Sequence, residues 1–247
     1  MSAYHRGTRE LTWGEVPNVR DLGGLVTPQG PTQFGRIARG PRRELLDDIG
    51  WQAARAWGLN TVVDLRCDYE VGVREEDPGA AVPQSVTIIS APTEDHENTE
   101  FQKTCFPILD SPAYWRHNLR ILPAMVRATL EAIAEATPGV LVHCSAGRDR
   151  TGMITSLLLA NAGVAPEVIA DDYALSVRAM AGIASHQPTH DRQAAWKPEQ
   201  VEDWVEKIHP LVVDFAQDVA THLDTIQLSH RTRARLRSLL VAPEPTR

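Results

Sequence analysis

The chain has 247 residues, of which 43% are hydrophobic and 23% are charged, and its net charge at neutral pH is −7. This length suits one large or two small domains, and the composition is typical of a folded globular protein. The negative charge argues against a general nucleic-acid binder, which needs a basic surface to neutralise phosphates. It leaves room for a small basic pocket.

Cysteine usage and the N-terminal residues indicate the compartment. Cys67, Cys105 and Cys144 are too few and too scattered for a disulfide framework, and no Cys-x-x-Cys or zinc-site spacing occurs. We therefore expect a cytoplasmic protein with no cofactor and no metal. Residues 1–14 lack the apolar core of a signal peptide. Export without a cleaved signal stays open, and no run approaches the ~20 apolar residues of an integral membrane segment.

In chain order, the first predicted element is an N-terminal hairpin over residues 21–40, where Gly-Gly and Pro-Gln-Gly lie between short β-rich flanks. Residues 91–111 show no period and are expected to form a loop. Short β-branched runs predict buried strands at 61–66, 85–90 and 140–144. Apolar residues at helical spacing predict helices at 42–58, 112–136, 151–162, 165–176, 198–223 and 229–240.

The order of these elements predicts the fold class. Strands that alternate with helices indicate an α/β fold, with a central, mainly parallel sheet flanked by helices on both faces and a helical C-terminal part. No convincing linker interrupts the chain, so we expect a single domain over residues 1–247. Residues of about 1–15 and 242–247 are expected to be flexible.

The sequence VLVHCSAGRDRTG places a charged turn between a buried strand and a helix. In such a turn, successive backbone N–H groups converge at the helix N-terminus and form an anion cradle. Gly147 permits the tight curl, and Arg150 can add a bidentate fork to a phosphate-sized oxyanion. The same positive field stabilises a thiolate at Cys144, a nucleophile placed for attack on phosphorus. The alternative, a buried structural cysteine, fits this charged turn poorly.

The segment HCSAGRDRTG resembles the phosphate-binding loop of the cysteine-dependent protein tyrosine phosphatase superfamily. The blocks NVRDLGG (18–24), VVDLRCDYE (62–70) and DDYALS (171–176) resemble a bacterial and fungal branch of atypical tyrosine or dual-specificity phosphatases. Some members of that branch also act on phosphoinositides. The resemblance covers most of residues 18–176 and is weaker beyond them. It implies the cysteine-dependent phosphatase fold and a phosphomonoester hydrolase.

The resemblance also implies roles for the loop residues. Cys144 would form a phosphocysteine intermediate. Thr151 would hydrogen-bond the thiolate and help hydrolysis, and His143 would support the loop from beneath. The phosphoryl oxygens would be held by the Arg150 side chain and by the backbone N–H groups of Ser145, Ala146, Gly147, Arg148, Asp149 and Arg150.

A leaving group needs a proton from a positioned acid, and no Trp-Pro-Asp loop occurs in this sequence. The first candidate is Asp149, where the branch has an aspartate credited with this role; structural pairing with Arg148 or Arg20 is the alternative. The second is Asp110, which lies 34 residues before the cysteine. The third is Asp64, at the end of a predicted strand.

Several polar residues outside the loop have two open interpretations each. Arg20 and Asp21 either brace the loop or belong to an ordinary hairpin entry. Arg39 and Arg66 either enlarge the positive field or form internal ion pairs, the latter with Asp64 in the case of Arg66. Cys67 is either a resolving thiol for an oxidised nucleophile or a buried, inert cysteine.

The preferred function is a protein tyrosine phosphatase with possible dual specificity, so the expected partner is a phosphorylated protein and no nucleic acid. A phosphoinositide or small-molecule phosphatase is the alternative, because Arg148 adds a second basic side chain to the cradle. Sulfur transfer and arsenate reduction fit less well, given the His before and the Thr-Gly after the loop. A non-catalytic phosphate-binding module would be expected to lack Cys144 or Arg150.

Overall fold

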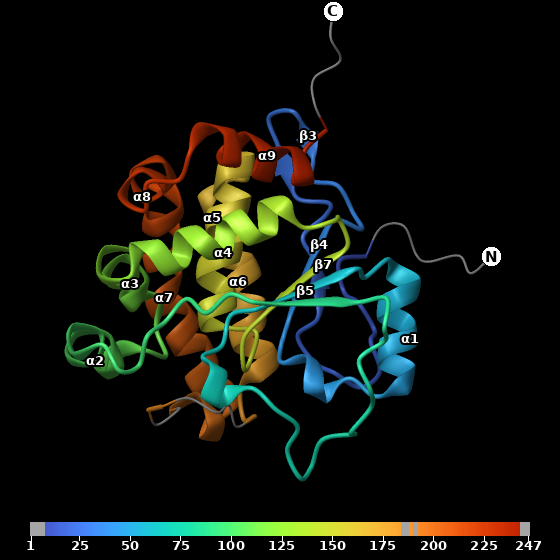
Figure 1. Cartoon of the computed structure of the whole chain (residues 1–247). Helices are drawn as coiled ribbons and strands as arrows, with labels where there is room; N and C mark the ends of the chain where they lie inside the picture. The colour runs from blue at the N-terminus through green and yellow to red at the C-terminus, as the bar shows by residue number, and fades with distance from the viewer. Residues whose placement is uncertain (1–7, 184–187, 190–191, 243–247) are drawn as a thin grey trace, which may run out of the picture.

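The structure is a computed structural model that describes residues 8–183, 188–189 and 192–242. Its centre is a five-stranded sheet in the order β1-β4-β7-β5-β6 (Figure 1). The four strands after β1 run parallel, and β1 is antiparallel to β4. This mostly parallel sheet confirms the predicted α/β class. The strand bounds are β1 Arg20–Asp21, β4 Ile37–Gly40, β5 Thr61–Asp64, β6 Thr87–Ser90 and β7 Val140–His143.

Helices cover both faces of the sheet, with α1 on one side and the larger group on the other (Figure 1). Alternating side chains of β7 serve the two faces: Val140 and Val142 join the larger core cluster, and Leu141 joins the smaller one beneath α1. The helix bounds are α1 Asp48–Trp57, α2 Thr99–Cys105, α3 Trp115–Ile121, α4 Pro123–Glu135, α5 Asp149–Ala162, α6 Pro166–Met180, α7 Pro198–Gln217, α8 Val219–Thr225 and α9 His230–Leu240.

Helix α5 is the central helix of the larger layer. All of its residues except Ala160 are buried, and beyond the first turn its sequence is mostly apolar rather than apolar on one face only. It follows β7 after a short loop, at the carboxyl edge of the parallel strands. Strand β5 lies beside β7 and ends in register with it, with Asp64 opposite His143. The topology therefore brings polar residues after β5 and β7 to one edge of the sheet.

Three predicted elements differ from the structure. Strand β6 is an exposed edge strand, not a buried one, because in the described part of the chain the sheet ends at it. The expected loop over 91–111 contains α2, which begins where the Asn98 side chain accepts a hydrogen bond from the Phe101 N–H. The long helix over 112–136 is broken before Pro123, since proline disfavours helical geometry in the residue that precedes it.

The hairpin and the C-terminal helices also differ in detail from the prediction. The hairpin consists only of β2 (Val26–Thr27) and β3 (Gly30–Pro31), while β1 and β4 join the main sheet. The predicted helix over 198–223 is divided into α7 and α8 at Asp218. Of the segments expected to be flexible, residues 1–7 and 243–247 lie outside the described residues. From Leu11 the chain is packed, and Trp13 is buried.

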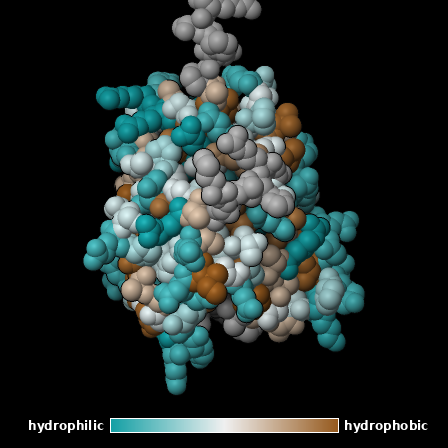
Figure 2. Space-filling model, turned by 90° about the vertical axis from the view of Figure 1, so that its right-hand side faces the viewer, coloured by the Kyte–Doolittle hydropathy of each residue, from teal (hydrophilic) through white to brown (hydrophobic). Residues whose placement is uncertain are grey.

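Figure 2 shows one face of the molecule, on which hydrophilic side chains dominate and hydrophobic ones are scattered between them. Among the described residues, no helix combines the length and the apolar character needed to cross a membrane.

Candidate active site

The loop between β7 and α5 turns its carbonyl groups outward. The carbonyl oxygen of Cys144 accepts a hydrogen bond from His143 Nδ1 at 2.9 Å, and that of Ser145 accepts from the Arg42 N–H at 3.0 Å. The next two carbonyls, of Ala146 and Gly147, are also bound, by side chains described below. In a planar trans peptide the N–H group points opposite to the carbonyl group. The N–H groups of four successive peptides therefore face the inner side of the loop.

Asn18 and Arg39 hold the outer side of the loop. Asn18 Nδ2 donates to the Ala146 oxygen at 2.9 Å and to the Gly147 oxygen at 3.2 Å. Arg39 Nη2 donates to the Gly147 oxygen at 2.9 Å. Arg39 also pairs with Asp172 at 2.6 Å, and although burial lowers the pKa of Arg39 to about 10, the guanidinium stays charged at neutral pH. Arg39 is thus an internally paired residue that braces the cradle.

Gly147 is the one position in the loop where only glycine fits. Its φ is +67°, in the left-handed region that side chains disfavour. A Cβ placed there would lie 2.3 Å from the carbonyl carbon and oxygen of Gly40. The loop therefore packs directly on the backbone at the end of β4, which fixes its distance from the sheet.

Arg150 is oriented by two acidic side chains. Its Nη1 and Nη2 donate to the two carboxylate oxygens of Glu70 at 2.6 and 2.7 Å, and its Nε lies 3.6 Å from Glu94 Oε2. All three side chains are nearly excluded from solvent. Burial opposes the charge on Arg150, but Glu94 and Glu70 raise its pKa well above the usual value, so the cation is permanent.

The acid candidates have different partners. Asp110 is bound on both carboxylate oxygens by Arg192, at 2.5 and 2.6 Å. Asp149 accepts from Arg148 Nε at 3.0 Å on one oxygen and from the Tyr173 hydroxyl at 2.8 Å on the other. The predicted pairing of Asp149 with Arg148 is therefore present, and the phenol hydroxyl of Tyr173 contacts the other oxygen.

Asp64 and His143 form the floor beneath the loop. Both oxygens of Asp64 accept from Arg66, which is the predicted ion pair, and Arg43 contacts the same carboxylate. Burial opposes ionisation of Asp64, but His143, Arg66 and Arg43 together hold its pKa below the usual range. Burial lowers the pKa of His143 to about 4. A carbonyl can only accept, so Nδ1 carries the proton of the neutral ring. His143 thus contacts the loop backbone, and its supporting role stays a prediction.

Arg20 and Asp21 contact different parts of the structure. Arg20 donates to the backbone oxygen of Asp172 at 2.9 Å and to the Asn18 side chain at 2.6 Å, so it braces the loop through Asn18. Asp21 accepts from the N–H groups of Gly23 and Gly35, which is the hairpin-entry arrangement. Burial raises the pKa of Asp21.

Two further residues are close to the loop without the contacts expected of them. Thr151 Oγ1 is buried and has no hydrogen-bond partner among the described residues, so the predicted bond to the thiolate is not formed in this structure. Cys67 Sγ donates to the Glu94 carbonyl at 3.2 Å, and burial next to Glu70 raises the pKa of this thiol to about 12. A thiol held protonated is a poor resolving nucleophile.

One group of side chains in the described part of the chain has the composition of a metal site. The ligand atoms of Cys67, Glu70 and His96 all lie within 4.8 Å of one another. The sequence does not show this group, because its members are not spaced as in a known zinc motif.

Sequence reasoning did not single out Asn18, Glu70, Glu94 or Asp172. The first two and the last lie inside the blocks that resemble the phosphatase branch, so those blocks were the available signal. Glu94 lies after β6 in a segment expected to be a featureless loop, and no pattern marks it.

The chain matches the tyrosine phosphatase family over residues 11–242.

Three relatives are similar to parts of the chain. The triple specificity protein phosphatase PtpB of Mycobacterium tuberculosis is 28% identical over 183 residues, which are 63% of this chain and 65% of that protein. A protein of Cupriavidus necator named as a candidate tyrosine-protein phosphatase is 29% identical over 182 residues, 70% of this chain and 64% of that protein. A tyrosine-protein phosphatase of Nostoc commune is 36% identical over 88 residues, 35% of this chain and 30% of that protein. The chain thus spans slightly less than two thirds of the first two relatives. Because the family match covers nearly the whole chain, the chain belongs to the tyrosine phosphatase family.

Proposed function

We propose that the protein is a cysteine-dependent phosphomonoester hydrolase that acts mainly on phosphotyrosine in proteins, with phosphoserine and phosphothreonine as further substrates. One observation carries the proposal: the four successive carbonyl groups from Cys144 to Gly147 are all hydrogen-bonded on the outer side of the loop. It turns four N–H groups toward a common inner side next to a buried cysteine and a permanently charged arginine. This arrangement suits a phosphoryl dianion.

In the proposed reaction, the Cys144 thiolate attacks phosphorus and the P–O bond to the substrate breaks. The backbone N–H groups and Arg150 hold the phosphoryl oxygens in the transition state. The departing oxygen receives a proton from a general acid, for which we propose Asp149, with Asp110 as the alternative. Water then attacks the phosphocysteine, releasing inorganic phosphate and the thiolate.

The environment of Arg148 favours a phosphoprotein over a polyphosphorylated head group. Arg148 is fully buried and its Nε donates to Asp149, so part of its guanidinium is engaged by an internal carboxylate. An arginine engaged by the carboxylate next to it in the chain has less charge to offer to a second phosphate of the substrate. The names of the relatives, tyrosine-protein phosphatase and triple specificity protein phosphatase, point to the same substrate class. A cytoplasmic location stays a prediction from cysteine usage.

The test is phosphate release from an aryl phosphate by the wild-type chain and by Cys144→Ser, in the presence of a chelator. We expect chelator-resistant activity that Cys144→Ser lacks, and a phosphocysteine trapped by rapid denaturation of the wild type alone. Phosphate release by Cys144→Ser would refute the mechanism. A panel of phosphopeptides and phosphoinositides then ranks the substrates, and a preference for the lipids would replace the proposed substrate class with the alternative.

A further inference from the structure

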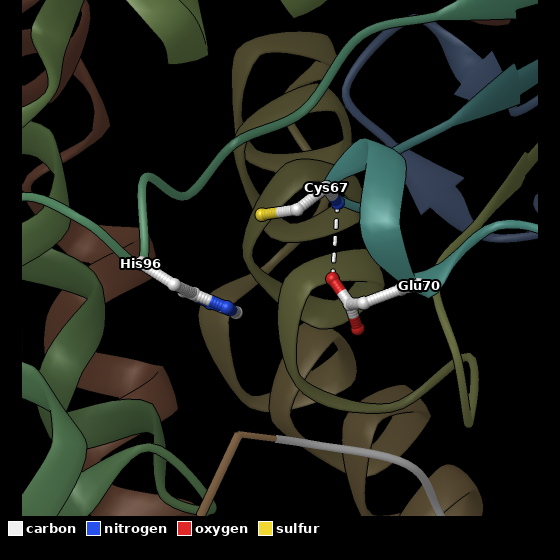
Figure 3. Close-up of side chains that lie close together, drawn as sticks. All are labelled: Cys67, Glu70 and His96. Atoms are coloured by element: carbon white, nitrogen blue, oxygen red, sulfur yellow. Dashed lines mark hydrogen bonds between the residues drawn. The ribbon is translucent and has the colours of Figure 1, made fainter.

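Cys67, Glu70 and His96 meet beside the candidate active site, outside the phosphate-binding loop. Glu70 ends the short helical turn η2 (Asp68–Glu70), Cys67 precedes that turn, and His96 lies in the segment after β6. Figure 3 shows the three side chains pointing into one space between these two segments. Their ligand atoms lie within 4.8 Å of one another. Glu70 and His96 are buried, and Cys67 is at most partly exposed.

The donor set is that of a thiophilic divalent cation. A thiolate, an imidazole and a carboxylate are the three ligand types that zinc takes in proteins, whereas magnesium and calcium take oxygen ligands. Tetrahedral zinc with bonds of about 2.0–2.3 Å needs its ligand atoms roughly 3.5 Å apart. The present spacing is close enough for side-chain adjustments on the order of 1 Å.

The surroundings already contain the supporting contacts that metal ligands usually have. Glu94 Oε2 lies 2.8 Å from His96 Nε2, which is the carboxylate–histidine pairing found behind metal-bound imidazoles. The Tyr69 hydroxyl contacts the other ring nitrogen, so one of these two contacts would be exchanged for the cation. The Cys67 N–H donates to Glu70 Oε2 at 3.0 Å and fixes the carboxylate beside the thiol.

The charge of the group also suits a cation. Glu70 and Glu94 face Arg150, so two carboxylates meet one guanidinium. Binding of a divalent cation with loss of the Cys67 proton to solvent would bring this set of groups to neutrality. A carboxylate has about four lone-pair sites, so Glu70 can bind a cation and still accept from Arg150.

From this geometry we propose that Cys67, Glu70 and His96 form a site for one thiophilic divalent cation, of which Zn²⁺ is the representative. The proposed reaction needs no cation, so this site is separate from catalysis and its existence does not depend on the proposed function. Because Glu70 also orients Arg150, an occupied site would lie in direct contact with the phosphate-binding machinery.

The test uses Co²⁺ as a spectroscopic probe in the full chain carrying Cys144→Ser, which removes the other thiol near the loop. Titration should produce a near-ultraviolet thiolate-to-cobalt charge-transfer band that saturates at one equivalent and disappears when Zn²⁺ is added. Adding Cys67→Ser should abolish the band, and adding Glu94→Gln should weaken binding by about 10–100-fold. Adding Cys105→Ser, which changes a buried thiol outside the group, should leave the titration unchanged.

Two outcomes would overturn the proposal. The first is the absence of a saturable band in the Cys144→Ser chain up to about 1 mM Co²⁺, because a dissociation constant above that value is weak binding. The other is a band that persists in Cys67→Ser. Far-ultraviolet circular dichroism shows whether each variant is folded, and His96→Gln replaces Cys67→Ser if the latter unfolds, with at least a tenfold loss of affinity expected. The readout is absorbance, so failure of the proposed phosphatase activity would not affect it.

Discussion

Arg150 and Glu70 form a two-pronged ion pair, with nitrogen–oxygen distances of 2.6 and 2.7 Å, in which the guanidinium meets the carboxylate edge to edge. The planar fork that Arg150 offers to Glu70 is the same fork that would hold two phosphoryl oxygens. Under the proposed function, a substrate therefore exchanges for at least one of these bonds, while the other keeps the side chain in place. Glu70 is a positioning residue in this scheme.

The first prediction separates the positioning by Glu70 from its charge. Glu70→Ala leaves Arg150 without its bidentate acceptor, so we expect kcat/KM to fall by about 10–100-fold, the cost of a small misplacement of a binding group. Glu70→Gln keeps an acceptor oxygen and should lose less than about tenfold. Steady-state kinetics on an aryl phosphate with chelator present measures both. Equal activity of Glu70→Ala and wild type would show that Arg150 needs no such support.

The second prediction concerns the general acid. Asp149→Asn should reduce the rate by about 10²–10⁴-fold on a substrate with a poor leaving group, because general acid catalysis contributes about that much. The loss should be much smaller on an aryl phosphate whose leaving group is already acidic. Asp110→Asn should show no such difference, since both its oxygens are bound by Arg192.

Glu94→Gln is the matched control for this comparison. Glu94 is another buried carboxylate at the site, close to Arg150 and to His96. If the dependence on the leaving group changes in Glu94→Gln and not in Asp149→Asn, the acid is Glu94 and the assignment of Asp149 is wrong.

The third prediction tests the outward fixation of the loop carbonyls. Asn18 has a φ of +61°, so Asn18→Gly removes the side chain without straining the backbone. Two loop carbonyls lose a donor, and kcat/KM should fall by about tenfold or more, since a lost partner of a buried group costs about 1–3 kcal/mol. Gln227→Gly, at another positive φ of 55°, is the matched control and should leave the kinetics unchanged. An Asn18→Gly enzyme with normal kinetics would mean that the cradle keeps its shape without this brace.

A fourth prediction concerns Gly147. Gly147→Ala puts a methyl group where the Gly40 backbone lies 2.3 Å away and imposes a left-handed conformation that costs about 1–3 kcal/mol. We expect the loop to move off the sheet and the activity to fall by about 10²-fold, as for a misplacement of about 1 Å. Thermal unfolding and phosphate inhibition constants, measured together, distinguish a displaced loop from an unfolded protein. Retained phosphate affinity would contradict the close packing.

How much the sequence could predict depends on how local each feature is. The turn between β7 and α5 is a continuous segment, so its composition was enough to predict an anion cradle with Cys144, Gly147 and Arg150 in it. The Arg66–Asp64 pair was also readable, since the two residues lie two positions apart at the end of one strand.

Long-range contacts were not readable in the same way. The partners of Arg150 are 80 and 56 residues away in sequence, and only the packing of η2 and the segment after β6 against the loop brings them together. The exposure of β6 was missed for a related reason: β-branched composition marks a strand, but only the sheet order makes it an edge. The break before Pro123 is different, because it is a local effect that the residue type alone predicts.

The fifth prediction is a pH dependence of stability that arises from His143. Burial lowers its pKa to about 4, against about 6.5 in an unfolded chain. Between these values the unfolded chain binds a proton that the folded chain does not, so stability falls as the pH drops from about 6.5 to about 4. The full effect on the free energy of unfolding is on the order of 3 kcal/mol, since each unit of pKa difference between the two states contributes about 1.36 kcal/mol.

His143→Asn keeps a side-chain donor for the Cys144 carbonyl and removes the titration, so its free energy of unfolding should depend less steeply on pH in this window. His222, whose pKa burial also lowers, titrates in the same direction, and His222→Asn measures its share. Asp64 and Asp172 have lowered pKa values and act in another range: their stabilisation is present above about pH 3.8 and lost as the pH falls below it. Denaturant titrations at several pH values above 4 therefore compare each variant with the wild type, and the difference isolates one histidine because the carboxyl groups are the same in both. An unchanged slope in His143→Asn would mean that the ring takes up its proton at the same pH in the folded and the unfolded chain, and would contradict the lowering of its pKa by burial.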